Sequence, residues 1–453
     1  MKYTPEKESL KQHKVPEWFH DAKLGIFIHW SLFSVPAFAG EKLTLVESSK
    51  RGIDVHMKNN PYAEWYLNSL RINGSPTQKY HKENFGEDFS YDGFAQIFNE
   101  EIKKWNPDEM VDLFKKAGAK YVVLVTKHHD GFLLWPSKYP NPKKEDYIAS
   151  RDIVGELTEA VKKKGLRMGF YYSGALDWSW NPNPIINEES WRTNGPSEKE
   201  YTEYANNHWY ELMDKYDPII LWNDIGYPPN TNVYEIFAYF YNKHPDGIVN
   251  DRWIQWHKSE FKHPKVRHRD FDTPEYRMMP DITERKWEST RGIGYSFGYN
   301  KMETEQDSLK PDELIRMFID IVSKNGNLLL NLGPMADGTI PEVQKNAIIG
   351  LGKWLEINGE GIYGTRPWKR AEGKTSDDND IRFTQKGENL YIHLLDKPQE
   401  SNLTILSLTL AESKKIQLLG SDGNLTWKQV DENINVSLPQ ELYDSAAYVL
   451  KIF

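Results

Sequence analysis

The chain has 453 residues, of which 39% are apolar and 27% are charged, with a formal net charge of −9 and no cysteine. This length exceeds one average domain, and the composition excludes a disordered chain, disulfides, thiolate catalysis and cysteine-ligated zinc. There is no stripe of lysine and arginine and no apolar stretch of membrane-spanning length, so we expect neither a nucleic-acid partner nor a membrane partner. The polar stretch 1–18 lacks the apolar segment of a signal peptide, which indicates a cytoplasmic protein.

The first part of the chain alternates strand-like and helix-like segments. Apolar runs of strand length that end in polar residues lie at 24–30, 119–130, 166–174, 218–226, 247–253 and 326–334. Each run predicts a strand buried on both faces. Helical stripes between the runs consist of Ile153, Val154, Leu157 and Val161, and of Leu314, Phe318 and Ile321. Thr339 and Glu342 predict a capping box ahead of a further helix.

This alternation predicts parallel strands, and polar residues at the carboxyl ends of many strands are typical of a (β/α)8 barrel. We therefore expect an α/β fold with a catalytic (β/α)8-like barrel domain over residues 1–360. An open doubly wound sheet is the alternative, although no glycine-rich phosphate loop follows the first strand. After about residue 365 the sequence changes to short β-forming runs separated by turns, which predicts a small C-terminal antiparallel β-sandwich over residues 366–453.

Four carboxylates are candidates for chemistry, and one of them lies at a predicted strand end. Asp224 follows the apolar run IILW, and this position favours a catalytic role in a barrel. Glu64, Glu275 and Glu288, each taken alone, indicate surface or structural residues. Two carboxylates on neighbouring strands are what glycoside hydrolysis requires, because one attacks the anomeric carbon or activates water and the other protonates the leaving oxygen.

Two adjacent histidines, His128 and His129, end the run LVTKHHD. Neighbouring strand residues point to opposite faces, so the pair does not easily chelate one metal ion, but at a strand end both can reach a polyhydroxylated ligand. One buried and one exposed histidine is an equally good interpretation of these two residues. Taken singly, His29 indicates a core histidine and Arg252 an ion-pair partner.

A set of segments resembles the α-L-fucosidases of glycoside hydrolase family 29. The resemblance covers the chain from about Trp18 to Gly361. Its segments read, in chain order, WFHDAKLGIFIHWSLFSVPAF, NPYAEWYLNSLR, AKYVVLVTKHHDGFLLW, LRMGFYYSGALDW, LWNDIGYP, VNDRW, KWESTRGIGYSFGYN and GNLLLNLGPMADGTIP. The set spans the whole predicted barrel. The C-terminal region fits the architecture of the family but carries no specific motif.

The resemblance implies a retaining exo-α-L-fucosidase that needs no metal ion or other cofactor. It implies that Asp224 is the nucleophile and Glu275 the acid/base, with Glu288 as the rival for the second role. The residues implied to hold the fucose hydroxyls are His29, Glu64, His128, His129, Tyr171, Trp222 and Arg252. We expect His128 and His129 to donate hydrogen bonds to the sugar, and Phe27 and Phe297 to receive its methyl group.

The implied partner is a fucosylated oligosaccharide or glycoconjugate, and a homo-oligomer is compatible with the sequence. Segments 47–59 and 252–277 depart from the family pattern, and we expect both to lie near the mouth of the pocket. Three other functions stay open at this point. They are a metal-dependent hydrolase with His29, His128, His129 and Asp224 as ligands, a sugar-binding protein without catalysis, and a retaining glycosidase with a different sugar specificity.

Overall fold

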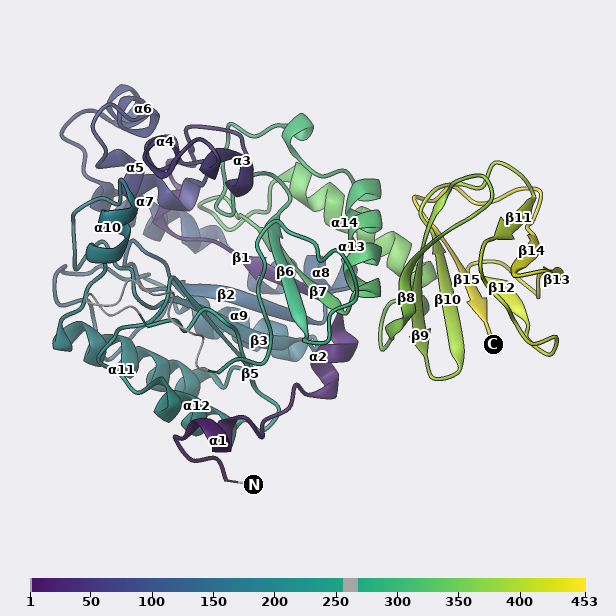
Figure 1. The fold of residues 1–453 in the computed structure, drawn as a ribbon. Coiled ribbons are helices and arrows are strands. Elements are labelled where there is room, and N and C mark those ends of the chain that lie inside the picture. Colours follow the sequence, from purple (N-terminus) through teal and green to yellow (C-terminus); the bar gives the residue numbers. More distant parts are fainter. Residues whose placement is uncertain (1, 256–267) are drawn as a thin grey trace.

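A curled sheet of seven parallel strands forms the centre of the first part of the chain (Figure 1). This computed structural model describes residues 2–255 and 268–453. The strands lie in the order β5-β4-β3-β2-β1-β7-β6. Their bounds are β1 (Leu24–Ile28), β2 (Tyr121–Lys127), β3 (Arg167–Ser173), β4 (Ile220–Asp224), β5 (Ile248–Val249), β6 (Trp287–Gly292) and β7 (Gly326–Leu332). All but β6 lie within the predicted apolar runs, which confirms the parallel α/β interpretation.

Strands β5 and β6 are the two edges of this sheet, and the segment 270–276 lies between them. The Asp270 N–H donates to the Val249 carbonyl of β5 at 3.0 Å. On the other side, the Glu288 N–H donates to the Asp272 carbonyl at 2.8 Å, and the Tyr276 N–H donates to the Thr290 carbonyl at 3.0 Å. This irregular segment therefore fills the place of an eighth strand between the two edges of the curled sheet, and the expected barrel-like fold is confirmed.

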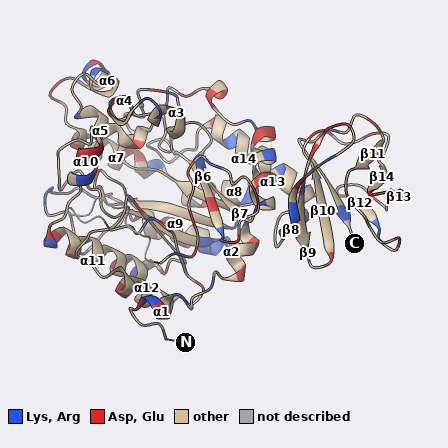
Figure 2. Cartoon of the chain, viewed as in Figure 1, with Lys and Arg blue, Asp and Glu red and all other residues tan. Residues whose placement is uncertain are grey.

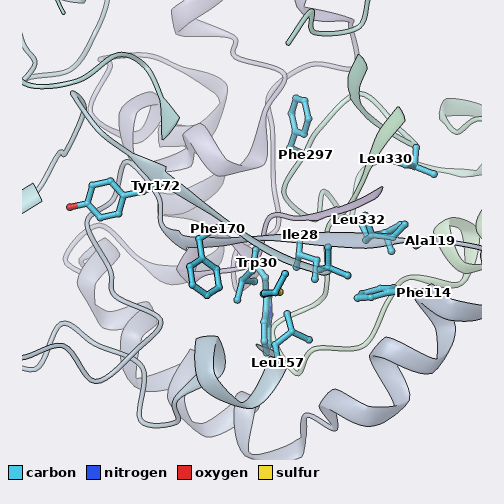
Figure 3. Close-up of a cluster of buried hydrophobic side chains, with 14 of the residues drawn as sticks. Ile28, Trp30, Phe114, Ala119, Leu157, Phe170, Tyr172, Phe297, Leu330 and Leu332 are labelled. Carbon is cyan, nitrogen blue, oxygen red and sulfur yellow. The ribbon is translucent and has the colours of Figure 1, made fainter. Parts of the chain in front are cut away.

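The longer helices cover the outside of the sheet. They are α8 (Pro107–Lys116), α9 (Ile153–Lys163), α11 (Lys199–Tyr216), α12 (Val233–Lys243), α13 (Pro311–Ser323) and α14 (Glu342–Asn358). Figure 3 shows Phe114 of α8 and Leu157 of α9 within the buried cluster that also contains Ile28 and Phe170 from the strands. The apolar stripes of the helices thus form one core with the outward-facing residues of the strands, while inward-facing residues such as Phe27, Val123 and Leu329 belong to a second buried cluster.

The expected capping box of α14 is wrong. The helix begins at Glu342, its N-cap is Pro341, and no side chain caps it. As the first helical residue, Glu342 is too early in the helix to be the third-residue partner that a capping box requires. The Thr339 N–H instead donates to Asp337 Oδ1 at 2.9 Å.

Shorter helices lie in the connecting segments. They are α1 (Lys7–Leu10), α2 (Glu17–Ala22), α3 (Leu45–Ser49), α4 (Ile53–Lys58), α5 (Tyr66–Leu70), α6 (Pro76–Phe85), α7 (Phe94–Glu101) and α10 (Glu188–Thr193). Short 3-10 helices are η1 (Leu32–Ser34), η2 (Ala63–Trp65), η3 (Tyr91–Gly93), η4 (Ile102–Lys104), η5 (Glu305–Asp307) and η6 (Gly359–Gly361).

The C-terminal part is an antiparallel β-sandwich, as expected. One sheet has the order β12-β15-β10-β9-β8 and the other the order β11-β14-β13. Their bounds are β8 (Arg366–Lys374), β9 (Asp380–Lys386), β10 (Asn389–Leu394), β11 (Asn402–Ile405), β12 (Ile416–Leu418), β13 (Trp427–Val430), β14 (Asn433–Ser437) and β15 (Tyr448–Ile452). The sandwich has an apolar core of its own and packs beside α13 (Figure 1). The Arg382 Nε donates to Asp320 Oδ1 at 2.6 Å across this contact.

The surface carries charges of both signs. In the view of Figure 2, basic and acidic segments are interspersed over the outer helices and the sandwich. No helix in residues 2–255 and 268–453 combines the length and the apolarity that crossing a membrane requires.

Candidate active site

A cavity of about 240 Å³ lies at the carboxyl ends of the first strands of the sheet. His29 follows β1, His128 and His129 follow β2, Tyr171 belongs to β3, and Asp224 ends β4. This is the face on which barrel enzymes carry their active sites. The cavity lining includes every site residue expected from the sequence except the rival Glu288. These residues are Phe27, His29, Glu64, His128, His129, Tyr171, Trp222, Asp224, Arg252, Glu275 and Phe297.

Asp224 and Arg252 form a charged pair in this cavity. Arg252 Nη1 donates to Asp224 Oδ1 at 2.9 Å, and the Tyr171 hydroxyl donates to Asp224 Oδ2 at 2.9 Å. Burial alone would raise the pKa of Asp224, but the positive charge of Arg252 and these hydrogen bonds outweigh burial and hold the pKa below its ordinary value. Asp224 is therefore an ionised carboxylate at neutral pH.

Glu275 is the second carboxylate bound to the same guanidinium. Arg252 Nη2 donates to Glu275 Oε2 at 3.2 Å, and the Tyr62 hydroxyl donates to Glu275 Oε1 at 2.7 Å. Arg252 is itself held by Thr273, because its Nε donates to Thr273 Oγ1 at 2.9 Å. Both Thr273 and Glu275 belong to the segment that fills the place of an eighth strand. That irregular segment therefore brings a second carboxylate close to Asp224.

Glu288 lies on β6 and is fully buried, but it does not line the cavity. It accepts hydrogen bonds from the Tyr121 hydroxyl and, at 3.1 Å, from Trp222 Nε1. Burial raises the pKa of Glu288 to about 7, although these hydrogen bonds lower it in part. Trp222 is thus the link between Glu288 and the cavity.

The hydrogen bonds of His29 and His129 fix which ring nitrogen of each carries the proton. Asn331 Nδ2 donates to the Phe297 carbonyl, so Asn331 Oδ1 accepts from His29 Nδ1 at 2.6 Å. The Ser173 hydroxyl donates to the Leu176 carbonyl, so Ser173 Oγ accepts from His129 Nδ1 at 2.6 Å.

Burial lowers the pKa of His29 to about 4 and that of His129 to about 3, so both rings are neutral at pH 7. A neutral imidazole that carries its proton on Nδ1 has an unprotonated Nε2. His129 therefore offers a hydrogen-bond acceptor at Nε2, which corrects the expectation that it donates to a sugar. His29 offers the same kind of acceptor.

His128 lies beside His129, with ring centroids 3.9 Å apart, and stacks on Tyr171 at 5.6 Å and 11°. Its Nδ1 is buried and has no hydrogen-bond partner among the described residues. Burial lowers the pKa of His128 well below its ordinary value, and the adjacent His129 adds to this effect. A buried polar atom without a partner is costly, so an unpartnered nitrogen in the cavity lining calls for an explanation such as a bound ligand group.

Glu64, on η2, is a buried acidic group in the same lining. Its Oε2 accepts from the Gly298 N–H at 2.7 Å and from the Ser296 hydroxyl at 3.3 Å. Burial raises the pKa of Glu64 to about 8, and the negative charge of Glu275 contributes, while the hydrogen bond from Gly298 works in the opposite direction. Glu64 is therefore mostly protonated at neutral pH and can itself donate a hydrogen bond.

Aromatic rings make up one wall of the cavity. Phe27 and Phe297 both pack against His29, with ring centroids 4.5 and 5.0 Å from it. Trp222 lies under the Arg252 guanidinium at 4.7 Å. This wall therefore combines apolar surface with the positive charge of Arg252, which suits a ligand ring that has both apolar faces and polar substituents.

Other lining residues were not expected from the sequence. They are Leu45, His56, Met57, Asn60, Tyr62, Trp65, Trp191, Ile225 and Thr290. His56 and Met57 confirm that segment 47–59 lies beside the pocket. Of segment 252–277, Arg252 and Glu275 line the cavity, whereas 256–267 lie outside the described residues. Tyr62 and Trp65 flank Glu64 in the motif NPYAEWY, but Leu45 and Trp191 have no local signal in the sequence.

In the described part of the chain, no group of three or more histidine and carboxylate side chains has an arrangement that could hold a metal ion. His29, His128, His129 and Asp224 line one cavity without forming such a group. The Nδ1 atoms of His29 and His129 are already bonded to Asn331 and Ser173.

Comparison with known proteins identifies the family. The family model described as Alpha-L-fucosidase matches residues 1–360, and the one described as Alpha-L-fucosidase C-terminal domain matches residues 374–453. The human tissue alpha-L-fucosidase is 33% identical over 451 residues, which cover 97% of this chain and 88% of the human protein. The Dictyostelium discoideum alpha-L-fucosidase is 33% identical over 452 residues, which cover 97% of this chain and 89% of that protein.

Solved structures agree with these relatives. The Thermotoga maritima alpha-fucosidase in complex with fucose is 44% identical, covers 100% of both chains and has a TM-score of 0.88. The Thermotoga maritima alpha-L-fucosynthase in complex with alpha-L-Fuc-(1-2)-beta-L-Fuc-N3 is 44% identical, also covers 100% of both chains and has a TM-score of 0.90. The chain therefore belongs to the α-L-fucosidase family, and it is a glycoside hydrolase of the fucosyl-hydrolysing type.

Proposed function

We propose that this protein is a retaining exo-α-L-fucosidase that releases terminal α-L-fucose from fucosylated glycans in two displacements. The observation that carries the proposal is the shared guanidinium, since Asp224 and Glu275 bind the two terminal nitrogens of Arg252. Two carboxylates on one guanidinium are held close to each other. Such closeness favours the retaining arrangement, in which the carboxyl groups stand about 5–5.5 Å apart, over the inverting one, which leaves room for a water molecule.

In the first displacement, ionised Asp224 attacks the anomeric carbon while Glu275 gives its proton to the leaving oxygen. A covalent fucosyl ester on Asp224 forms, and the leaving alcohol departs. In the second displacement, Glu275 takes a proton from water, the water oxygen attacks the anomeric carbon, and the ester bond to Asp224 breaks. The lowered pKa of Asp224 supports its role as the nucleophile, because the attacking group has to be ionised.

The lining supports recognition of one sugar with several hydroxyls. Neutral His29 and His129 supply acceptors, and Arg252 and protonated Glu64 supply donors. A site built from buried polar groups of this kind strongly rejects a sugar that lacks a matching hydroxyl. The volume of about 240 Å³ is below the roughly 300–1,000 Å³ of pockets for drug-sized ligands and suits a single terminal ring.

The deciding experiment is chemical rescue of Asp224→Gly. The variant is expected to lose almost all hydrolysis of an aryl α-L-fucoside, and azide is expected to restore turnover and to yield β-L-fucosyl azide. The azide enters the space left by the carboxylate and attacks from the same side as Asp224 does. All assays are run after chelation of metal ions, so that a metal-dependent reaction would be recognised by its loss.

Glu288→Gly is the matched control, because it removes a buried carboxylate that does not line the cavity. Azide is expected to restore nothing in this control. Full activity of Asp224→Gly, or an α-configured azide product, would contradict the assignment of Asp224 as the nucleophile.

A further inference from the structure

A second, smaller cavity of about 60 Å³ adjoins the candidate active site. The two cavities have Trp191 and Ile225 in common as lining residues, so these two side chains form the border between them. Within the proposed function, the first cavity holds the terminal fucose. We propose that Trp191 and Ile225 form the binding site for the sugar ring on the leaving-group side of the bond that is cleaved.

Trp191 presents a fixed aromatic surface at this border. It lies on α10, whose first turn is held by a capping box between Asn187 and Ser190. The indole stacks on Trp65 of η2, with ring centroids 5.7 Å apart and an angle of 5° between the rings. Trp65 is buried, whereas Trp191 stays partly exposed. A ring that is packed on one side and accessible on another loses little conformational freedom when a ligand stacks on it.

Ile225 directly follows Asp224 and adopts a strained backbone conformation with φ of 56°. A β-branched residue rarely adopts positive φ, and such strain persists only where the surroundings enforce it. Here the Gly174 N–H donates to the Asp224 carbonyl at 3.0 Å, and Asn223 Nδ2 donates to the Gly226 carbonyl at 2.8 Å. The strained turn thus puts an aliphatic side chain at the cavity border, one residue after the carboxylate that is proposed to attack.

The chemistry of the border fits a pyranose ring. The C–H face of a pyranose packs on an indole and on a branched aliphatic side chain, while its hydroxyls stay in water or meet polar groups. The second cavity is too small for a whole sugar, since about 60 Å³ equals the volume of about two water molecules. It suits one exocyclic substituent, such as the hydroxymethyl group of galactose or the acetamido group of N-acetylglucosamine. The leaving group is therefore a hexopyranose whose ring lies over Trp191 and Ile225.

The test compares substrates with and without a leaving ring. α-L-Fucosyl fluoride has no ring in its leaving group, whereas fucosyl-galactose and fucosyl-N-acetylglucosamine disaccharides, taken in every available linkage, have one. For Trp191→Ala, the ratio of kcat/KM for the best disaccharide to kcat/KM for the fluoride is expected to fall about tenfold, which is the scale of a lost aromatic contact. Trp180→Ala is the matched control, since Trp180 lies in the same connection but packs on Tyr201 and Tyr204 and lines neither cavity.

An unchanged ratio in Trp191→Ala, or an equal fall in Trp180→Ala, would overturn the inference. Wild-type protein that hydrolyses the fluoride but none of the disaccharides would overturn it as well. Failure of the wild type on the fluoride itself would remove the proposed function, and the inference with it.

A measurement on the unaltered protein covers the case in which Trp191→Ala does not fold. Transfer of fucose from the fluoride to methyl β-D-galactopyranoside is compared with transfer to methanol at equal concentration. A preference of about tenfold or more for the galactoside supports a binding site for the leaving ring. Transfer to an alcohol is the reverse of the first displacement, so the acceptor binds where the leaving group was bound. Equal transfer to both alcohols would refute the site.

Discussion

Replacing Arg252 with methionine removes the guanidinium that contacts both carboxylates of the cavity. Two unit charges about 4 Å apart interact by about 4 kcal/mol at an effective dielectric constant of about 20, which equals about 3 pKa units. Arg252 Nη1 and Asp224 Oδ1 are 2.9 Å apart, and the Asp224 side chain is only 12% exposed, so water screens this interaction weakly. The hydrogen bond from Tyr171 stays in place and offsets part of the loss.

We therefore expect the pKa of Asp224 to rise in Arg252→Met, because burial then opposes the ionised form with less compensation. The nucleophile has to be ionised, so the acidic limb of the kcat/KM profile should move to higher pH, by about 2 pH units if most of the Coulomb interaction is lost. The assay is the hydrolysis of an aryl α-L-fucoside as a function of pH. The maximal rate will also fall in this variant, but only the position of the limb reports the pKa.

Arg252→Lys is the control, because it loses the two-pronged hydrogen bonding but keeps a positive charge near Asp224. Its acidic limb is expected to move by less than about one pH unit, although its maximal kcat/KM also falls. If the limb of Arg252→Met stays at the wild-type position, Arg252 does not set the ionisation of the nucleophile, and the electrostatic reasoning is refuted.

Three further predictions concern other carboxylates. Glu275→Ala should slow the hydrolysis of fucosides with poor leaving groups far more than that of activated aryl fucosides, because only a basic leaving oxygen needs the proton. The basic limb of the pH profile should also disappear. The same pattern in Glu288→Ala would assign the acid/base role to Glu288. The pKa of Glu64 in the folded protein is about 8, above its ordinary value of 4.5, so its contribution to stability is lost as the pH rises from about 4.5 to about 8. Over this range the melting temperature should fall more steeply with pH in the wild type than in Glu64→Gln. Equal slopes in the two proteins would disprove this. Asp177→Ala should lower the free energy of unfolding, measured in urea, by about 3–5 kcal/mol, because it leaves Lys127 charged and unpaired in a place where both side chains of the pair are 0% exposed. Adding Lys127→Met to this variant should restore most of the lost stability. A loss below about 1 kcal/mol in Asp177→Ala would count against a strong pair.

The sequence predicts the sheet well wherever burial alone selects the residues. A parallel strand covered on both faces is mostly apolar, so β1, β2, β4 and β7 are visible as apolar runs with few polar residues. Strand β6 is an exception because its sequence, WESTRG, is mostly polar, and its buried Glu288 is hydrogen-bonded to Tyr121 and Trp222, which lie far away in the sequence. A prediction based on local hydropathy cannot detect partners that lie far away in the sequence.

Much of the site also follows from the sequence, because residues at the carboxyl ends of parallel strands converge without further information. Asp224, His29 and the pair His128 and His129 come together in this way, and their roles in catalysis and binding stay predictions. Glu275 is different, since it lies on an irregular segment without a hydropathy period, and only the family resemblance named it.

The sequence by itself determined the order of the elements, the kind of sheet and the residues that end its strands, because these depend on local periodicity and on burial. The tertiary structure decided which carboxylate shares Arg252 with Asp224, which nitrogen of His129 carries the proton, and that Trp191 lies at the border of the pocket. Each of these depends on contacts between residues far apart in the chain. Such contacts are set by the packing of whole elements and leave no mark in any short stretch of sequence.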